Sequence, residues 1–233
     1  MQKWTLNEVK NKLKEVNTIG WISSNRVHDT GIGKTLEDLM GLEENNIALP
    51  DFGRMELKSQ RAKTGSMITL FTKKPEGITN AEIRNKYGYP DRHFPNVKCL
   101  RQTLNKGKNA MGFCLFVDDK DGKVYLKKGN KKIGYYEISF IKEKAIEKIG
   151  NGLILVLAEN KKESGKELFR FSEAYLLKDI DVENLIEYSK YDIRLGVNGS
   201  GKLVGKPHDH GSAFRIFKKD LLKLFKTHKK ILG

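Results

Sequence analysis

Two acidic residues and a lysine lie close together in the segment PDFGRMELKS, residues 50–59. Asp51 is followed after four residues by Glu56, and Lys58 comes two residues later. If MELKS forms a β-strand, the alternation of side chains puts Glu56 and Lys58 on the same face. Asp51 joins them if the preceding strand ends at that face or bends toward it. The spacing therefore predicts two carboxylates beside a positive charge.

This combination suits the hydrolysis of a phosphodiester bond. Two carboxylates supply the oxygen ligands that a hard divalent cation prefers, and we expect Mg²⁺ at Asp51 and Glu56. Such a metal polarises the scissile phosphate and lowers the pKa of a bound water, while Lys58 orients that water or stabilises developing negative charge. The pattern D-x4-E-x-K is short, and 31% of the residues are charged, so a strand edge with alternating charges is the structural alternative.

The overall charge favours a polyanionic partner. The chain has 44 Lys and Arg against 29 Asp and Glu, which gives a formal net charge of +15. Positive charge of this size promotes binding to phosphates through counterion release, so nucleic acid is the expected partner. A membrane surface is not favoured, because the Lys-rich helices show only core-type apolar faces.

Length and composition indicate a globular protein with a sizeable core. The 233 residues, 38% of them hydrophobic, suit one domain or two closely joined lobes. The longest apolar run, GLILVLA at 152–158, is too short to span a bilayer, and the first residues do not look like a signal peptide. Cys99 and Cys114 show no CxxC spacing, so we expect reduced thiols and a cytoplasmic protein.

Two helices are predicted before the acidic segment. Residues 5–16 carry a capping box at Thr5 and Glu8 ahead of an apolar face. That face consists of Leu6, Val9, Leu13 and Val16. A second helix is predicted to begin near Thr35, with Leu36, Leu39 and Met40 on one side and Glu37 on its flank.

The rest of the chain is dominated by β-prone segments. The predicted strands are IALPDF, MELKS, MITLFTKK, FRFSEAYLL, YDIRLGV and SAFRIF, and GLILVLAEN is typical of a strand buried on both faces. MGFCLFVDDKDGKVYLKKG predicts a hairpin that turns at Asp121-Gly122. Residues 79–109 are polar and show no clear element, and KKDLLKLFK predicts an amphipathic helix near the C-terminus. The acidic segment therefore belongs to a mixed α/β fold.

Other readings of the motifs remain open. GVNGSGKL at 196–203 and GIGKT at 31–35 resemble P-loops and suggest a nucleotide triphosphatase. The first segment has Leu203 where a P-loop has the Ser or Thr that binds Mg²⁺. The second has His28 where the P-loop pattern has its first glycine. HDHG at 208–211 suggests a zinc site, although no other His or Cys is near. A basic DNA-binding module without catalysis is the remaining alternative.

Several separate segments resemble the MvaI/BcnI family of type II restriction endonucleases, which is related to the MutH mismatch-repair nickase. These segments are PDFGRMELKS, TGIGKTLEDLMGLEENN at 30–46, TLFTKKP at 69–75 and DIRLGVNGSGKLVGKPHDHGSAFRI at 192–216. The likeness is strongest to the MvaI-like members. It spans most of the chain and is weakest between about 90 and 150.

The resemblance implies a PD-(D/E)xK core, a mixed sheet with helices, and a two-lobed MutH-like monomer that clasps duplex DNA. It implies a catalytic lobe over about 1–180 and a DNA-recognition lobe over 181–233, with contributions from 80–150. Asp51, Glu56 and Lys58 match the catalytic pattern, and Glu37 matches a helix acid near the same site. A glutamate on a helix beside the strands can act next to the metal ligands or hold Lys58.

The segment 192–216 carries side chains suited to reading bases. Arg binds guanine through two donors, and a carboxylate accepts from the cytosine amino group, so a G·C-rich target is expected. The candidate base-reading residues are Asp192, Arg194, His208, Asp209, His210 and Arg215. Lys202 and Lys206 suit phosphate contacts.

The resemblance implies a target of the CCNGG type, either CCWGG or CCSGG. Asn198 and Gly199 stand where MvaI-like members have a Tyr-His pair, so the central base stays open, and Asn198 joins the base-reading candidates. The sequence thus predicts a Mg²⁺-dependent type II site-specific deoxyribonuclease of a restriction-modification system. It is expected to act on double-stranded DNA as a monomer that nicks one strand and then the other, with a DNA methyltransferase as a separate protein.

Overall fold

The structure is a computed structural model that describes residues 4–26, 30–42 and 55–233. The chain forms two compact units. The first contains Met1–Ile68, Ile146–Val182 and Phe217–Gly233, and the second contains Thr69–Ala145 and Glu183–Ile216. Each unit is therefore assembled from segments that lie far apart in the sequence. The functions predicted for residues 1–180 and 181–233 stay predictions.

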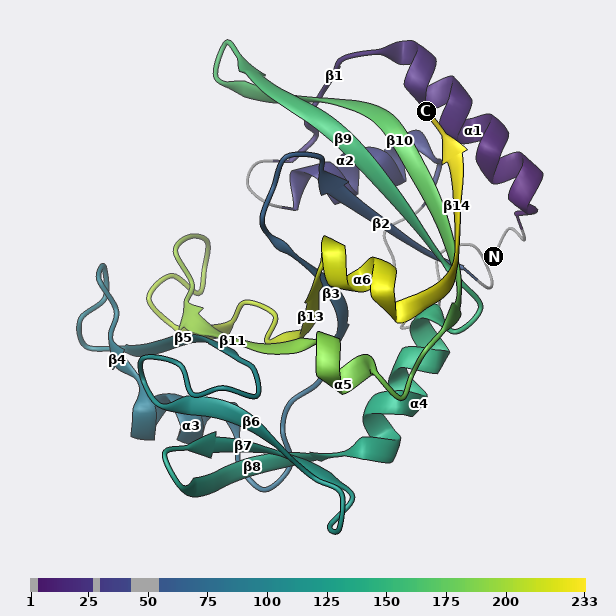
Figure 1. The fold of residues 1–233 in the computed structure, drawn as a ribbon. Coiled ribbons are helices and arrows are strands. Elements are labelled where there is room, and N and C mark those ends of the chain that lie inside the picture. The colour runs from purple at the N-terminus through teal and green to yellow at the C-terminus, as the bar shows by residue number, and fades with distance from the viewer. Residues whose placement is uncertain (1–3, 27–29, 43–54) are drawn as a thin grey trace. The chain divides into compact units, whose positions relative to one another are not determined.

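The first unit is built on a mixed sheet. Its strand order is β1-β10-β9-β2, and β14 pairs with residues Ala174–Ile180 of β10 (Figure 1). β2 runs parallel to β9, whereas the other pairings are antiparallel. The elements of this unit are α1 (Leu6–Ile19), β1 (Ile22–Ser23), α2 (Gly31–Leu39), β2 (Glu56–Arg61), β9 (Leu153–Glu163), β10 (Lys166–Ile180), α6 (Lys218–Leu224) and β14 (Phe225–Leu232).

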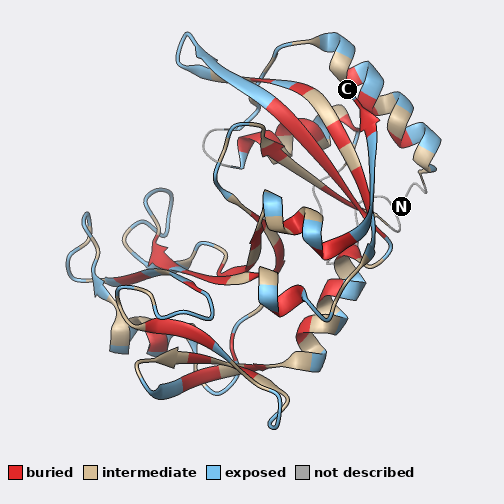
Figure 2. Ribbon diagram, viewed as in Figure 1, coloured by how far each residue is buried: buried red, intermediate tan, exposed pale blue. Residues whose placement is uncertain are grey.

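The apolar run in β9 forms the centre of this sheet. Ile154, Val156 and Ala158 join a core that also contains residues of α1 and α2. Leu153, Leu155 and Leu157 point to the opposite face and are buried as well, so β9 is red from Leu153 to Ala158 in Figure 2. The expectation of a strand buried on both faces is confirmed.

The two N-terminal helices cover the face that carries this core. α1 begins with the predicted capping box of Thr5 and Glu8, and it buries Val9, Leu13 and Val16. α2 begins at Gly31, not near Thr35 as expected. Thr35 is buried inside the helix, where its hydroxyl accepts a hydrogen bond from Asn25 N, so it does not act as a cap.

The second unit contains two sheets. One has the order β3-β13-β11-β5-β4, with β12 paired to β11, and the other is the meander β6-β7-β8. The predicted hairpin at Asp121-Gly122 joins β6 to β7 and is confirmed. The elements are β3 (Met67–Thr72), α3 (Asn80–Tyr87), β4 (Tyr89–Pro90), β5 (Lys98–Leu104), β6 (Phe113–Asp118), β7 (Lys123–Lys128), β8 (Lys131–Glu137), α5 (Leu185–Tyr188), β11 (Lys190–Val197), β12 (Pro207–Asp209) and β13 (Ala213–Phe217). The unit boundaries also fall within three elements: within β3 after Ile68, within α4 (Ile138–Ile149) after Ala145, and before the last residue of β13.

Two regions differ from the sequence predictions. Residues 79–109 hold regular structure, because Thr79 and Glu82 form a capping box for α3 and β5 pairs along β11. The C-terminal helix predicted over residues 218–226 is confirmed for Lys218–Leu224, and only Phe225 and Lys226 belong instead to β14. Pairing with the open edge of β10, together with burial of Ile231 and Leu232 in the core, outweighs the local helical pattern.

No helix in the described part of the chain is long and apolar enough to cross a membrane.

Candidate functional site

Glu56 and Lys58 lie on one face of β2. Leu57 between them points into the core of the first unit, so alternation directs its two neighbours to the opposite face. Lys58 Nζ donates a hydrogen bond to Glu56 Oε1. Glu56 is only 3% exposed, so an anionic side chain is held inside the protein next to a cation. This arrangement matches the strand geometry expected from the sequence.

Lys148 of α4 supplies a second positive charge to the same carboxylate. Its Nζ lies 3.9 Å from Glu56 Oε2. Burial of a carboxylate is costly unless opposite charges and hydrogen bonds compensate it, and two lysines reduce that cost. Lys148 could not be connected with Glu56 from the sequence, because α4 was not predicted and the two residues are far apart in the chain.

Glu37 lies on α2, the helix that packs against the Leu57 face of β2. A Cβ atom added at Gly33 would lie 4.0 Å from both Glu37 Oε1 and Ser59 Oγ, so these two side chains approach the same point. Ser59 is on the same side of β2 as Leu57, whereas Glu56 and Lys58 are on the other. The helix acid therefore lies beside β2 on the side that carries Leu57 and Ser59, opposite Glu56 and Lys58, and its role at the site stays a prediction.

Asp51, the other predicted metal ligand, lies outside the described residues, as does the predicted strand IALPDF. Within the described ranges, no group of three or more His, Cys, Asp or Glu side chains is arranged to hold a metal ion. The zinc reading of HDHG therefore gains no support. Of the two predicted metal ligands, Glu56 is therefore the one that the structure describes. Its buried carboxylate supplies oxygen atoms of the kind that a hard divalent cation prefers.

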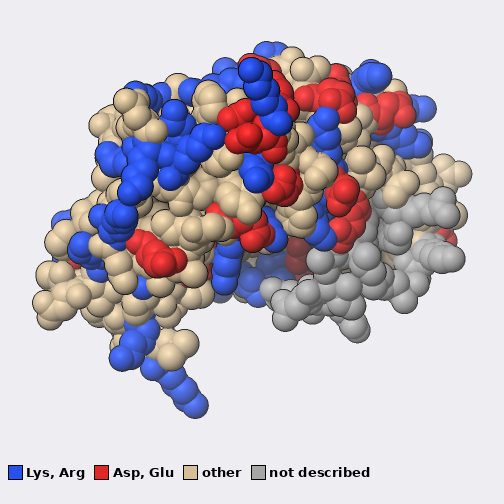
Figure 3. Space-filling view, turned by 90° about the horizontal axis from the view of Figure 1, so that it is seen from below, with Lys and Arg blue, Asp and Glu red and all other residues tan. Residues whose placement is uncertain are grey.

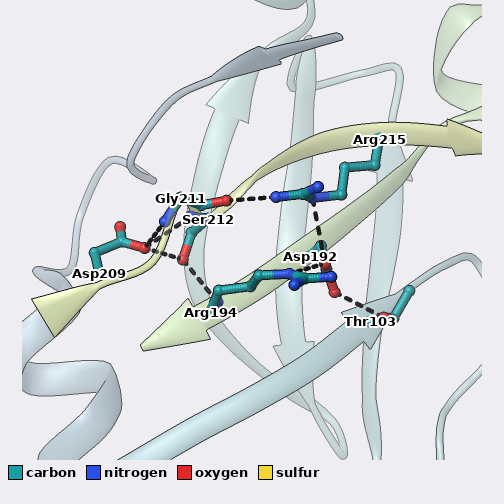
Figure 4. Close-up of polar contacts among 7 residues, drawn as sticks. All are labelled: Thr103, Asp192, Arg194, Asp209, Gly211, Ser212 and Arg215. Atoms are coloured by element: carbon teal, nitrogen blue, oxygen red, sulfur yellow. Dashed lines mark hydrogen bonds and ion pairs between the residues drawn. The ribbon is translucent and has the colours of Figure 1, made fainter. Parts of the chain in front are cut away.

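A second polar cluster lies in the other unit and is centred on Asp192 of β11. Its carboxylate accepts hydrogen bonds from Thr103 Oγ1 at 2.7 Å and from Arg194 Nε at 2.6 Å. Arg215 Nε lies 3.3 Å from the same oxygen that Arg194 contacts. Figure 4 shows both guanidinium groups next to this carboxylate. β5, β11 and β13 therefore bring together residues that are distant in sequence.

Asp209 organises the turn between β12 and β13. Its Oδ1 accepts from Gly211 N, Ser212 N and Ser212 Oγ at 2.7–3.1 Å. Its Oδ2 accepts from Asn80 Nδ2 at 2.8 Å. Ser212 Oγ in turn accepts from Arg194 N at 2.8 Å, which ties the turn to β11 (Figure 4). Both predicted acidic base readers are thus engaged in intramolecular hydrogen bonds.

The basic candidates differ in exposure. The Arg194 side chain is 45% exposed, whereas that of Arg215 is 15% exposed and donates from Nη2 to Gly211 O at 3.0 Å. Burial lowers the pKa of the Arg215 guanidinium, and the charge of Arg194 acts in the same direction while Asp192 opposes both. Arg194 is therefore the more available donor.

His208 and His210 are exposed next to each other at the end of β12, with ring centroids 4.8 Å apart. His210 Nε2 lies 3.1 Å from Val197 O. A Cβ added at Gly196 would come within 2.7 Å of the His210 ring, so the glycine leaves the space that the ring fills. The two histidine rings are therefore neighbours, and their role in reading bases stays a prediction.

The loop from Asn198 to Lys206 joins β11 to β12. Lys202 and Lys206 are exposed on it, and Asn198 N and Lys206 O hydrogen-bond across its base. A P-loop requires a helix directly after the glycine-rich turn, but this loop returns as a strand. The segment GIGKT lies within α2 and forms no phosphate-binding loop. Both P-loop readings are therefore wrong.

Four contributors to these clusters were missed by the sequence analysis. They are Asn80, Thr103, Lys148 and Ser212. Each acts through a contact that spans many residues or through a neutral side chain, so residue type alone gave no signal.

Figure 3 shows how charges are distributed on one face of the molecule. Lys and Arg side chains lie among Asp and Glu side chains toward the centre and upper right, whereas the left part carries mostly Lys and Arg. The net charge of +15 belongs to the molecule as a whole.

The mixed sheet that presents an acidic residue and a lysine from one strand is the core of a PD-(D/E)xK nuclease. Residues 10–225 match the model of the MvaI/BcnI restriction endonuclease family. The chain belongs to this family of site-specific DNA endonucleases, and the resemblance stated from the sequence is confirmed.

Solved structures agree with this assignment. The chain is similar to the structure of restriction endonuclease MvaI in complex with its cognate DNA substrate, with 31% sequence identity and a TM-score of 0.88. The match covers 97% of this chain and 98% of that one. Restriction endonuclease MvaI in the absence of DNA is 32% identical over 100% of both chains, with a TM-score of 0.56. No curated protein matches. The chain is accordingly a restriction endonuclease that acts on DNA.

Proposed function

We propose that this restriction endonuclease cleaves double-stranded DNA at a CCNGG-type site, CCWGG or CCSGG, and that Mg²⁺ is its metal. The observation that carries the proposal is the pairing of Glu56 with Lys58 on one face of β2 in a chain of this family. The MvaI structure that contains cognate DNA supports duplex DNA as the substrate.

In this proposal Asp51 and Glu56 hold Mg²⁺. The bound metal would supply Lewis-acid polarisation of the phosphate and a water of lowered pKa. Lys58 carries a positive charge beside Glu56, where it can stabilise the charge that develops on a phosphate oxygen. Glu37 supports the site from α2. Divalent metal use is general for such endonucleases, and Mg²⁺ itself is the part that we propose.

The base contacts are assigned to exposed or partly exposed donors. Arg194, Arg215, His208 and His210 would reach base edges, and Asn198 would face the central base pair, where the sequence leaves CCWGG and CCSGG open. Lys202 and Lys206 would bind phosphates and so fix the position of the DNA without reading its sequence. Asp192 and Asp209 are engaged in hydrogen bonds with other protein groups.

A monomer that carries one catalytic centre must cut the two strands in separate events. We therefore propose that the enzyme nicks one strand, reorients on its nearly palindromic site and cuts the other. A DNA methyltransferase encoded separately would protect the host sites.

The first experiment is digestion of two supercoiled plasmids, one with a single CCWGG site and one with a single CCSGG site. Each is incubated with Mg²⁺ or with EDTA, and the fragment ends are sequenced. We expect transient open-circular DNA and then linear DNA from one plasmid in Mg²⁺ alone. Linear DNA without an open-circular intermediate at limiting enzyme would contradict sequential nicking. Uncut DNA that still shows a salt-sensitive gel shift would favour a binding module without catalysis.

A further inference from the structure

We propose that Asp192 is a positioning residue that sets the orientation of Arg194 and Arg215 for guanine contacts and does not itself contact a base. This inference rests on the proposed function, because it concerns how the same base-reading surface is built. It changes the role of Asp192 from accepting a cytosine amino group to holding two donors.

The first argument is the occupancy of the carboxylate. Oδ1 accepts from Thr103 Oγ1, and Oδ2 faces the Nε atoms of both arginines. The Asp192 side chain is only 6% exposed. A cytosine amino group would have to displace a charge-assisted hydrogen bond and enter a nearly closed space. The neutral hydrogen bond that it formed would be weaker than the one that it replaced, so the exchange is unfavourable.

The second argument is the geometry of the guanidinium groups. Arg194 uses Nε for Asp192, and across the described residues its two terminal nitrogens have no hydrogen-bond partner. Two donors at the end of a guanidinium group match the O6 and N7 acceptors of guanine. Contact through Nε therefore fixes the side chain while leaving its recognition end available.

The third argument is electrostatic. Two guanidinium groups that face one carboxylate oxygen repel each other, and their combined charge of +2 is reduced to +1 by Asp192. Without that anion we expect Arg194, the more exposed of the two, to swing into solvent. The affinity for guanine would fall because the side chain must be ordered again on binding.

Thr103 completes the arrangement. Its hydroxyl donates to Asp192 Oδ1 and so fixes the rotation of the carboxylate plane. Thr103 lies on β5, in the region 79–109 that showed no clear element in the sequence. A Thr103→Val variant keeps the shape of this side chain and removes one hydrogen bond.

The binding test combines protein variants with altered bases in the cognate duplex, in the absence of Mg²⁺. One duplex carries 7-deazaguanine, which lacks the N7 acceptor, and another carries a pyrimidine without the 4-amino group in place of cytosine. In the wild type, loss of N7 is expected to weaken binding by about 5- to 150-fold. In Asp192→Asn the same base change should cost less than about 2-fold, because the arginines no longer make that contact well.

The amino-free pyrimidine discriminates between the two roles of Asp192. If Asp192 positions the arginines, removal of the amino group changes the affinity of the wild type and of Asp192→Asn by the same factor. A penalty in the wild type that disappears in Asp192→Asn would show a direct contact with cytosine and overturn the inference. Thr103→Val should change the responses to both altered bases in the same direction as Asp192→Asn, but by smaller factors.

A second measurement does not need DNA. ¹⁵N relaxation of the Nε–H groups of Arg194 and Arg215 reports their picosecond-to-nanosecond motion in the free protein. Asp192→Asn should increase this motion, most of all for Arg194, whereas unchanged order for Arg194 would overturn the inference. Asp121→Asn is the control. It removes a carboxylate that is paired with Lys132 and not with an arginine, so it should leave the motion of Arg194 and Arg215 unchanged.

The two measurements separate the inference from the function it rests on. If the wild type binds no CCNGG duplex, the proposed target is wrong, but the relaxation data still decide whether Asp192 orders the arginines. Thermal unfolding of each variant checks that the fold is retained.

Discussion

Buried carboxylates in this protein are paired with two kinds of cation. Glu56 faces the ammonium groups of Lys58 and Lys148, whereas Asp192 faces guanidinium groups. An ammonium is a compact charge on a flexible stem, but a guanidinium is a planar group that keeps a fixed geometry with a carboxylate. We therefore expect the Glu56 carboxylate to exchange a lysine for a metal ion, and the Asp192 carboxylate to keep its partners.

Glu56→Gln should reduce cleavage at least about 100-fold, because it removes the negative charge that holds the metal beside the phosphate. Specific binding without Mg²⁺ should change little. The measurement is the rate of plasmid linearisation together with a gel shift. Glu159→Gln, an exposed acid on β9 of the same sheet, is the matched control and should cut normally. Full activity of Glu56→Gln would remove Glu56 from the catalytic site.

Lys148→Met should lower the Mg²⁺ concentration needed for half-maximal cleavage by about 2- to 5-fold, because a cation that competes for Glu56 is removed. Isothermal titration of Mg²⁺ into the free protein checks the same effect without turnover. Lys144→Met, one helical turn earlier on α4, is the control. An increased requirement for Mg²⁺ in Lys148→Met would show that Lys148 assists metal binding.

At the scale of elements, the sequence predicted those whose signal is local. The capping box of Thr5 and Glu8 and the long apolar run of β9 were both read correctly. The C-terminal helix was predicted correctly over Lys218–Leu224, but β14 was not predicted because it depends on pairing with the edge of β10. α3 was overlooked in spite of the Thr79 capping box. The placement of Glu56 and Lys58 on one face followed from strand alternation, whereas the partners of Asp192 required knowledge of which strands meet.

An ion pair also links strands that are not neighbours. Arg61 at the end of β2 donates from Nε and Nη2 to the carboxylate of Glu167 on β10, at 2.7 and 2.6 Å, across the intervening β9. Hydrogen bonds from Arg61 hold the pKa of Glu167 below its usual value of 4.5. The stability from this pair is therefore present above pH 4.5 and is lost as pH falls through the lowered pKa of the folded state.

Glu167→Gln should lower the free energy of unfolding at pH 7 by about 1–3 kcal/mol, and the difference from wild type should shrink at acidic pH. Urea denaturation at a series of pH values measures this. Glu163→Gln, on the same hairpin and more exposed, should have a small effect at every pH. A difference that grows toward low pH would contradict the assigned sign.

At the scale of the whole molecule, the charge of +15 determines how binding responds to salt. Six to ten phosphate contacts would lower affinity by about 10³- to 10⁵-fold between 50 and 200 mM salt. Lys202→Ala should reduce the slope of log K against log salt by about 1 on any duplex.

Arg194→Ala should instead weaken binding mainly on the cognate site by about 1–3 kcal/mol. Equal losses on random DNA would reassign Arg194 to a phosphate.

The interleaving of the two units bears on how the enzyme is made in a cell. In the sheet that carries Glu56 and Lys58, β14 pairs with β10. β14 comes last in the chain among the strands of this sheet, so the ribosome synthesises it after all of the others. A nascent chain on the ribosome therefore lacks part of the core behind these residues, because Ile231 and Leu232 have not yet been added. We expect DNA cutting to begin only after translation has passed β14, so unfinished copies of a nuclease would not endanger the genome that encodes it.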